Sequence, residues 1–163
     1  MSPSPVRLNH AVLFVTDVSR SLRFYQEVFG MELIGPSFGD RAAFLRLPKS
    51  ANHHDLGLFA APPLDRPSWR RAPGLYHLAW QVDTIDELAE CLQVLSSAGA
   101  LVGSSDHGAT KSLYGADPDG NEFEILWMLP QADWGEYGTA AVVEPLNLEA
   151  EIKRWSGVHT AWT

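Results

Sequence analysis

The stretch LNHAVLFVTDVSRSLRFYQEVFGMELIG, residues 8–35, decides the fold, because it returns in altered form as LYHLAWQVDTIDELAECLQVLSSAGALVG, residues 75–103. A constant offset of 67 residues pairs Leu8 with Leu75, His10 with His77 and Val15 with Val82. Repetition at a fixed offset indicates that one supersecondary unit occurs twice. The sequence therefore predicts a chain made of two modules.

Each copy opens with a short β-type run that contains the histidine, and a helical pattern follows it. Asp17 in the first copy and Thr84 in the second are residue types that cap the start of a helix. Apolar side chains then recur at three- and four-residue steps, which is typical of a helix with one buried face. Gly30 and Gly99 favour helix ends at those positions.

Three short runs with strand character follow each predicted helix. They are 33–34, 42–47 and 56–60 in the first copy, and 101–102, 112–116 and 123–128 in the second. The order β-α-β-β-β, present twice, predicts an α+β fold with two curved sheets whose outer sides are covered by helices. We expect two βαβββ modules at about 7–60 and 74–128, which together form a single domain over residues 1–128.

A segment rich in proline and arginine, residues 61–74, separates the copies and is typical of an exposed linker. After the second copy, residues 129–163 form a C-terminal tail with three tryptophans, Trp134, Trp155 and Trp162. Large apolar rings favour burial, so we expect the tail to pack on its own domain or on a partner subunit. PLNLEAEIKRW within it predicts a short helix.

Charge and composition exclude several classes of function. The chain has 12 Lys and Arg against 20 Asp and Glu, a net charge of -8, which argues against nucleic-acid binding. It has one cysteine, Cys91, and so no intrachain disulfide. No uncharged apolar run reaches the roughly 18 residues that a membrane crossing needs, and no signal-peptide pattern opens the chain. We expect a soluble cytoplasmic protein without a nucleic-acid or membrane partner.

Three polar groups stand among apolar neighbours: His10, His77 and Glu124. An unpaired carboxylate is costly to bury, so Glu124 needs a partner. In one interpretation the histidines match only because repeats share residues, and Glu124 makes a hydrogen bond in the core. In the other, two imidazoles and one carboxylate leave open coordination positions, as a non-haem Fe(II) centre requires.

These residues and the surrounding pattern resemble the vicinal oxygen chelate superfamily over about residues 7–128. Within it the chain looks most like the type I extradiol ring-cleavage dioxygenases. The family fingerprint matches HGATKSLYGADPDGNEFE, at His107, Leu113, Tyr114, Asp117, Pro118, Gly120 and Glu124. One departure is Ser105, where the family usually has a small or apolar residue.

The resemblance implies a metal centre and a reaction. His10, His77 and Glu124 would ligate Fe(II), or Mn(II) in its place, and the substrates would be a catechol-type aromatic diol and O2. The stretch NHHDLGLF, residues 52–59, is similar to the segment that supplies the acid–base histidine, and we assign that role to His54. Tyr114 would hydrogen-bond the substrate oxygen, and His107 would orient it.

Two details stay open at this stage. Strand alternation places His53, rather than His54, on the side of Gly57, unless a bulge intervenes. The offset of 67 also carries Glu124 back to Gly57, which has no side chain, whereas four-ligand relatives use a carboxylate from both modules. Asp55, two residues away, is the remaining candidate for a fourth ligand.

Two other functions fit the same fold. One is a metal-dependent lyase, isomerase or thiol transferase, and the other is a non-catalytic binding protein for an antibiotic-like small molecule. Phe44, Trp80 and Trp127 are candidate pocket residues for an aromatic guest, although aromatic residues in strands are more often core. The two predicted modules would together form a metal-binding cup. Exchange of identical modules is an easy route to dimers, so we expect a homodimer in which this cup is closed within one chain or between two.

Overall fold

The structure is a computed structural model that describes residues 8–35, 39–61, 75–139 and 142–160. The chain divides into two compact units, Met1–Ala72 and Pro73–Thr163, and each is described by itself. The predicted linker lies outside the described residues apart from Ala61, as does Trp162. Among the described helices, none combines the length and apolar character that crossing a membrane demands.

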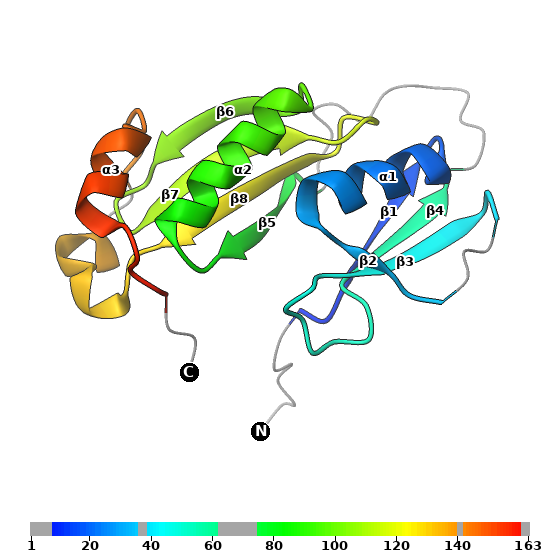
Figure 1. Cartoon of the computed structure of the whole chain (residues 1–163), viewed down its shortest axis with the longest axis horizontal. Coiled ribbons are helices and arrows are strands. Elements are labelled where there is room, and N and C mark those ends of the chain that lie inside the picture. Colours follow the sequence, from blue (N-terminus) through cyan, green and yellow to red (C-terminus); the bar gives the residue numbers. More distant parts are fainter. Residues whose placement is uncertain (1–7, 36–38, 62–74, 140–141, 161–163) are drawn as a thin grey trace. The chain divides into compact units, whose positions relative to one another are not determined.

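The first unit is a four-stranded mixed sheet with one helix (Figure 1). Its elements are β1 (Ala11–Val15), α1 (Val18–Phe29), β2 (Glu32–Leu33), β3 (Ala42–Arg46) and β4 (Leu56–Ala60). The strand order is β1-β4-β3-β2, with β1 parallel to β4 and the other pairs antiparallel. Helix α1 contacts β3 and β4, so one side of the sheet is covered.

The second unit repeats this arrangement (Figure 1). Its first five elements are β5 (His77–Val82), α2 (Ile85–Ser97), β6 (Leu101–Asp106), β7 (Thr110–Ala116) and β8 (Glu122–Met128). The strand order is β5-β8-β7-β6, with β5 parallel to β8. The predicted α+β fold of two βαβββ modules is confirmed.

Both helices begin where the sequence predicts, and α2 ends at Ser97, two residues before the predicted Gly99. Asp17 accepts a hydrogen bond from the Arg20 N–H at 2.9 Å, and Thr84 accepts one from the Glu87 N–H at 3.1 Å. Helix α1 ends at Gly30, whose φ of 63° lies in the left-handed region that glycine tolerates. Helix α2 buries Ile85, Leu88 and Leu95 completely against its sheet.

Strands β6 and β7 are both longer than predicted, and β6 shows the larger difference. The sequence predicts a strand at 101–102, whereas β6 continues to Asp106. Residues 103–106 read GSSD, which has little intrinsic strand preference. Antiparallel pairing with β7, such as Ser104 opposite Leu113, gives them extended geometry through tertiary contact.

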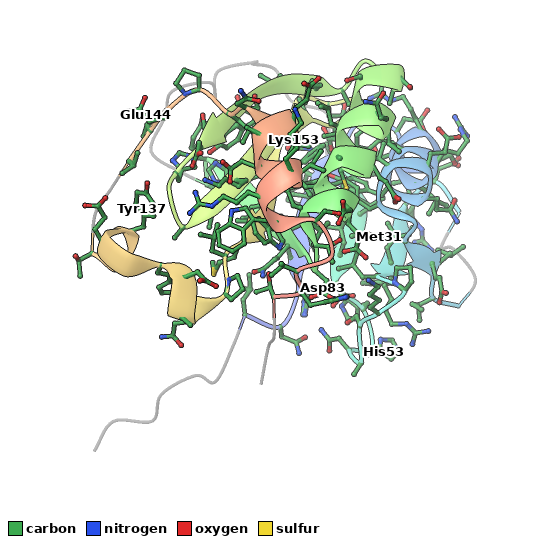
Figure 2. The ribbon with its side chains drawn as sticks, turned by 60° about the vertical axis from the view of Figure 1, so that its left-hand side comes forward. Met31, His53, Asp83, Tyr137, Glu144 and Lys153 are labelled. Carbon is green, nitrogen blue, oxygen red and sulfur yellow. The ribbon has the colours of Figure 1, made fainter. Side chains whose placement is uncertain are left out.

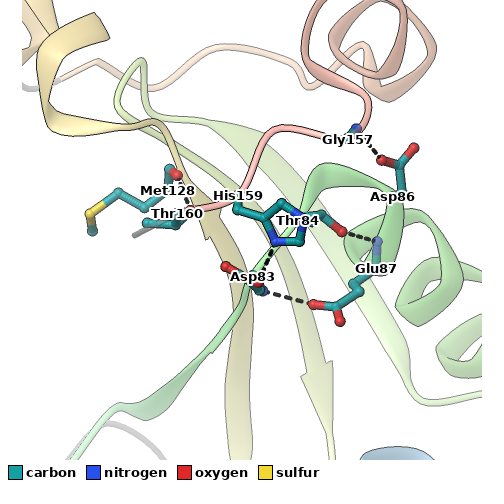
Figure 3. A network of polar contacts seen from close by, with 8 residues as sticks. All are labelled: Asp83, Thr84, Asp86, Glu87, Met128, Gly157, His159 and Thr160. Carbon is teal, nitrogen blue, oxygen red and sulfur yellow. Dashed lines mark hydrogen bonds and ion pairs between the residues drawn. The ribbon is translucent and has the colours of Figure 1, made fainter. Parts of the chain in front are cut away.

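The C-terminal segment, defined here as residues 129–139 and 142–160, packs on the rest of the second unit. It contains two short 3-10 helices, η1 (Gln131–Asp133) and η2 (Gly135–Gly138), and the helix α3 (Leu148–Trp155). Helix α3 contacts α2, and the Trp155 and Trp127 ring centroids are 6.0 Å apart. The end of the segment is tied to the start of α2 by a polar network (Figure 3).

Candidate metal centre

Two of the predicted metal ligands lie side by side in the second unit. His77 opens β5 and Glu124 lies in the adjacent strand β8, opposite Ala79. The two residues share one face of the sheet because side chains alternate along a strand. The His77 Nε2 atom is 3.3 Å from the Glu124 Oε2 atom, and the Glu124 side chain is 11 % exposed.

This spacing suits two ligands of one cation. Imidazole nitrogen and carboxylate oxygen atoms bind first-row metals at about 2.1 Å, so neighbouring donors on one ion lie about 3 Å apart. The His77 side chain is 26 % exposed and the Glu124 side chain 11 %, so both groups have already lost most of their water, which favours a bound cation. The His77 and Glu124 side chains therefore fit a divalent metal.

Tyr114 and His107 form a second pair beside this one. Tyr114 lies in β7 directly opposite Glu124. Its hydroxyl oxygen is 2.8 Å from the His107 Nε2 atom. Burial raises the pKa of the Tyr114 hydroxyl, and the negative charge of Glu124 raises it further. Tyr114 therefore keeps its proton at neutral pH.

The turn between β7 and β8 fixes these relationships. The buried Asp117 carboxylate accepts hydrogen bonds at 2.9 Å from the Asp119 N–H, the Asn121 N–H and the Asn121 side chain. Gly120 has a φ of 81°, a conformation that residues with a Cβ rarely adopt. The DPDGN sequence thus sets the register in which Tyr114 stands opposite Glu124.

The first unit brings His10 and His54 together. Their ring centroids are 4.5 Å apart, and the Phe44 ring lies 5.0 Å from His54. The Asn52 side chain ties the loop to the chain before β1, because it donates to the Asn9 carbonyl at 2.6 Å and to the His54 carbonyl at 2.9 Å. His10 itself directly precedes β1 rather than lying within it.

His53 and His54 differ in their surroundings. His53 is exposed on the loop before β4, as Figure 2 shows, whereas His54 is half-buried. The His53 Nδ1 atom lies 3.0 Å from the His54 Nδ1 atom. Burial lowers the pKa of His54, and the nearby His10 and His53 imidazoles lower it further, while Asp55 acts in the opposite direction.

Asp55 already has other partners. One carboxylate oxygen accepts a hydrogen bond from the Leu47 N–H and the other from the Ser50 hydroxyl, both at 2.9 Å. These hydrogen bonds to Asp55 stabilise the loop between β3 and β4. At Gly57 an added Cβ would lie 3.3 Å from Val12 and 3.5 Å from Phe44, so aromatic and apolar side chains fill the space over this glycine.

The predicted site residues thus form two groups, each within its own unit. His77, Glu124, Tyr114 and His107 are one group, and His10 and His54 are the other. Among the described residues, no three histidine, cysteine, aspartate or glutamate side chains gather as a complete ligand set. His10 therefore stays a predicted third ligand.

One further contact could not be predicted from the residue types. The Val142 carbonyl of the C-terminal segment lies 2.9 Å from the His107 Nδ1 atom. A main-chain acceptor has no residue type to identify it. The apolar character of the tail was the one available signal that this segment packs near other residues.

Comparison with known proteins identifies the family. The family model described as Glyoxalase/Bleomycin resistance protein/Dioxygenase superfamily matches residues 7–125. The chain is 32% identical over 155 residues to a catechol-2,3-dioxygenase of Bacillus subtilis, covering 90% of this chain and 53% of that protein. It thus spans about half the length of that relative. A lactoylglutathione lyase of Haemophilus influenzae is 30% identical over 128 residues, covering 74% of this chain and 92% of that protein.

Solved structures show the same fold. A glyoxalase/dioxygenase from Nostoc punctiforme aligns with a TM-score of 0.64 and 21% sequence identity, covering 78% of this chain and 97% of that one. At this identity the likeness supports the fold alone.

Proposed function

This chain belongs to the glyoxalase/bleomycin resistance protein/dioxygenase superfamily, and on that basis we propose that it is an Fe(II)-dependent extradiol dioxygenase. The reaction would open a catechol-type ring beside its two hydroxyl groups with O2. One observation carries the proposal: His77 and Glu124 lie 3.3 Å apart, with the Tyr114–His107 pair next to them. That is the arrangement implied by the fingerprint between His107 and Glu124.

His77 and Glu124 would hold the metal, with His10 as the third ligand predicted from the sequence. A bound ferrous ion supplies a Lewis acid that makes a diol easier to deprotonate and a redox centre that reacts with O2. Two imidazoles and one carboxylate leave coordination positions open, as such chemistry requires. Mn(II) is the alternative metal for the same residues, since it also binds carboxylate oxygen.

His54 would act as the acid–base residue. Burial and the two neighbouring imidazoles keep the pKa of His54 below its ordinary value, so the ring is neutral near pH 7. A neutral imidazole accepts a proton from the substrate hydroxyl and returns it later in the reaction. The half-buried position of His54 beside His10 supports this role over the exposed His53.

Tyr114 and His107 would orient the substrate. The Tyr114 hydroxyl stays protonated because burial and Glu124 raise its pKa. The hydrogen bond with His107 holds the Tyr114 hydroxyl in place. Tyr114 stands opposite the proposed metal ligand Glu124 in the neighbouring strand β8. A hydroxyl fixed in this way positions a diol oxygen without being consumed in the reaction.

A metal-dependent lyase is the second candidate. The likeness to a lactoylglutathione lyase over 74% of this chain favours it. Gly57 weighs against it, since the position that holds Glu124 in the second unit has no side chain in the first, and Asp55 is already engaged. Such a lyase would retain metal binding and consume no oxygen.

The test is metal analysis of protein purified without oxygen, followed by oxygen uptake and ultraviolet-visible spectra with a panel of catechols. We expect stoichiometric iron, oxygen consumption and a new yellow chromophore from the opened ring.

The Glu124→Ala variant should lose both iron and activity. Glu122→Ala is the matched control, because Glu122 is an exposed carboxylate on the same face of β8. An iron-loaded, active Glu124→Ala protein would refute the assignment, whereas bound metal without oxygen uptake would indicate the lyase.

A further inference from the structure

The C-terminal segment runs beside the strand end that carries His107. Glu144 and Asp106 form a two-way backbone pair, with N–H to carbonyl distances of 2.8 and 2.9 Å. The Tyr137 ring lies so close to Gly108 that an added Cβ there would stand 2.4 Å from it. Figure 2 shows Tyr137 and Glu144 on this segment. Val142, between them, places its carbonyl 2.9 Å from the His107 Nδ1 atom.

Helix α3 anchors the segment on the far side of Val142. The buried Lys111 ammonium of β7 contacts Asp106 at 2.6 Å and the Glu151 carboxylate of α3 at 3.5 Å. The Trp155 ring packs near Trp127. The carbonyl of Val142 is therefore held between two anchored stretches, which fixes its direction toward His107.

A main-chain carbonyl only accepts hydrogen bonds, so the contact requires a proton on the His107 Nδ1 atom. In a neutral imidazole the other nitrogen, Nε2, is then an acceptor. The group 2.8 Å from Nε2 is the Tyr114 hydroxyl, which must donate its single proton to it. The direction of the Tyr114–His107 hydrogen bond therefore follows from the contact between the Val142 carbonyl and His107.

We propose that the Val142 carbonyl is a positioning group that holds His107 in its Nδ1–H tautomer and so turns the Tyr114 hydroxyl proton toward His107 and away from Glu124. Tyr114 stands opposite Glu124 and has one proton to give. If the other tautomer were present, Nε2–H would donate to the Tyr114 oxygen, and the hydroxyl proton would go to the Glu124 carboxylate. That hydrogen bond would occupy a lone pair that a cation needs.

The consequence for the site rests on the proposed function, in which Glu124 is a metal ligand. With its proton on the His107 side, the Tyr114 oxygen presents lone pairs toward the site and accepts a hydrogen bond from a substrate hydroxyl. The tautomer itself does not depend on metal, substrate or activity. It can therefore be measured separately from the proposed function.

The first measurement is ¹⁵N NMR of histidine-labelled, metal-free protein at pH 8, where ordinary imidazoles are neutral. The His107→Gln variant assigns the His107 signals by their absence. We expect a protonated Nδ1 and an unprotonated Nε2. A protonated Nε2 in the wild-type chain would overturn the proposal, whether or not the protein later shows oxygen uptake.

The second measurement uses a variant in which the Val142 carbonyl is a weaker hydrogen-bond acceptor. Replacing Val143 with its α-hydroxy acid converts the peptide bond after Val142 into an ester, whose carbonyl is a poorer acceptor, and keeps the Val143 side chain, which is 74% exposed. Val143→Ala is the matched control, because it keeps the amide. We expect the ester to show a mixture of His107 tautomers and an apparent Kd for Mn(II) raised about 10-fold, as for other groups that orient metal ligands indirectly. An unchanged tautomer, or an unchanged Kd despite a changed tautomer, would overturn the proposal.

Discussion

Gly57 and Glu124 occupy equivalent positions in the two sheets. Gly57 pairs with Val12 across β1 and β4, and Glu124 pairs with Ala79 across β5 and β8, so the offset of 67 residues carries one pair onto the other. On the other side, Phe44 stands opposite Gly57 where Tyr114 stands opposite Glu124. One pair of positions is therefore apolar in the first unit and polar in the second.

The glycine at position 57 indicates that the first unit cannot accommodate a carboxylate at the position equivalent to Glu124. Gly57→Glu should lower the free energy of unfolding by about 1–3 kcal/mol, because the new side chain meets Val12 and Phe44 in filled space. Urea unfolding measures the change. Gly103→Ala is the control, since an added Cβ there meets nothing within 4 Å, and it should be neutral or slightly stabilising. A Gly57→Glu protein as stable as the wild type would show that the space is not filled.

A second prediction separates the two neighbouring histidines. His54→Gln should lower kcat by about 10²–10⁴-fold, the usual contribution of a general acid–base residue, and leave the iron content unchanged. His53→Gln should change kcat only a few-fold, because His53 is exposed. Oxygen uptake at saturating catechol gives kcat, and metal analysis gives the iron content. A larger loss in His53→Gln would reverse the assignment of the two residues.

The repeat made most of the fold predictable. Equivalent residues such as His10 and His77 established the offset, and the strand register keeps it in both parallel pairs. The offset of 67 residues does not hold across the β3–β4 and β7–β8 connections. Tyr114 stands three positions later than the offset predicts from Phe44, because the two modules connect their last strands with turns of different length. A single offset carries no information on such a change within a module.

The histidine pair shows where strand alternation stops applying. Alternation favoured His53, yet β4 begins only at Leu56, so His53 and His54 lie in a loop whose course is set by the Asn52 and Asp55 hydrogen bonds. The ring contact with His10 belongs to His54. The C-terminal contacts were less predictable still, since Val142 acts through its main chain and lysine is a residue type that is seldom buried.

That buried lysine supports a third prediction. The Lys111 side chain is 6 % exposed and lies between Asp106 and Glu151. Lys111→Met should lower the free energy of unfolding by about 3 kcal/mol, because it leaves two carboxylates without their cation. Arg46→Met is the control: the Arg46–Glu32 pair is 38% and 56% exposed, and such pairs contribute at most about 1 kcal/mol. Equal losses in the two variants, measured by urea unfolding, would contradict this account of Lys111.

The final prediction concerns pH and the end of the C-terminal segment (Figure 3). The Asp86 carboxylate accepts hydrogen bonds from the Gly157 N–H at 2.7 Å and the Ser156 hydroxyl at 2.9 Å, and these bonds lower its pKa below the ordinary 3.8. A lowered carboxyl pKa stabilises the docked segment fully above pH 3.8, and this contribution is lost as the pH falls through the folded-state pKa.

Hydrogen exchange of the Gly157 amide, corrected for the intrinsic effect of pH, follows this loss. We expect slow exchange in the wild type at neutral pH and a progressive rise below pH 3.8. Asp86→Asn should exchange faster at neutral pH and show no such transition, since its side chain does not titrate. His159→Gln, which removes the neighbouring contact with Asp83 at 2.6 Å, should leave the transition in place. A transition that persists in Asp86→Asn would assign it to another group.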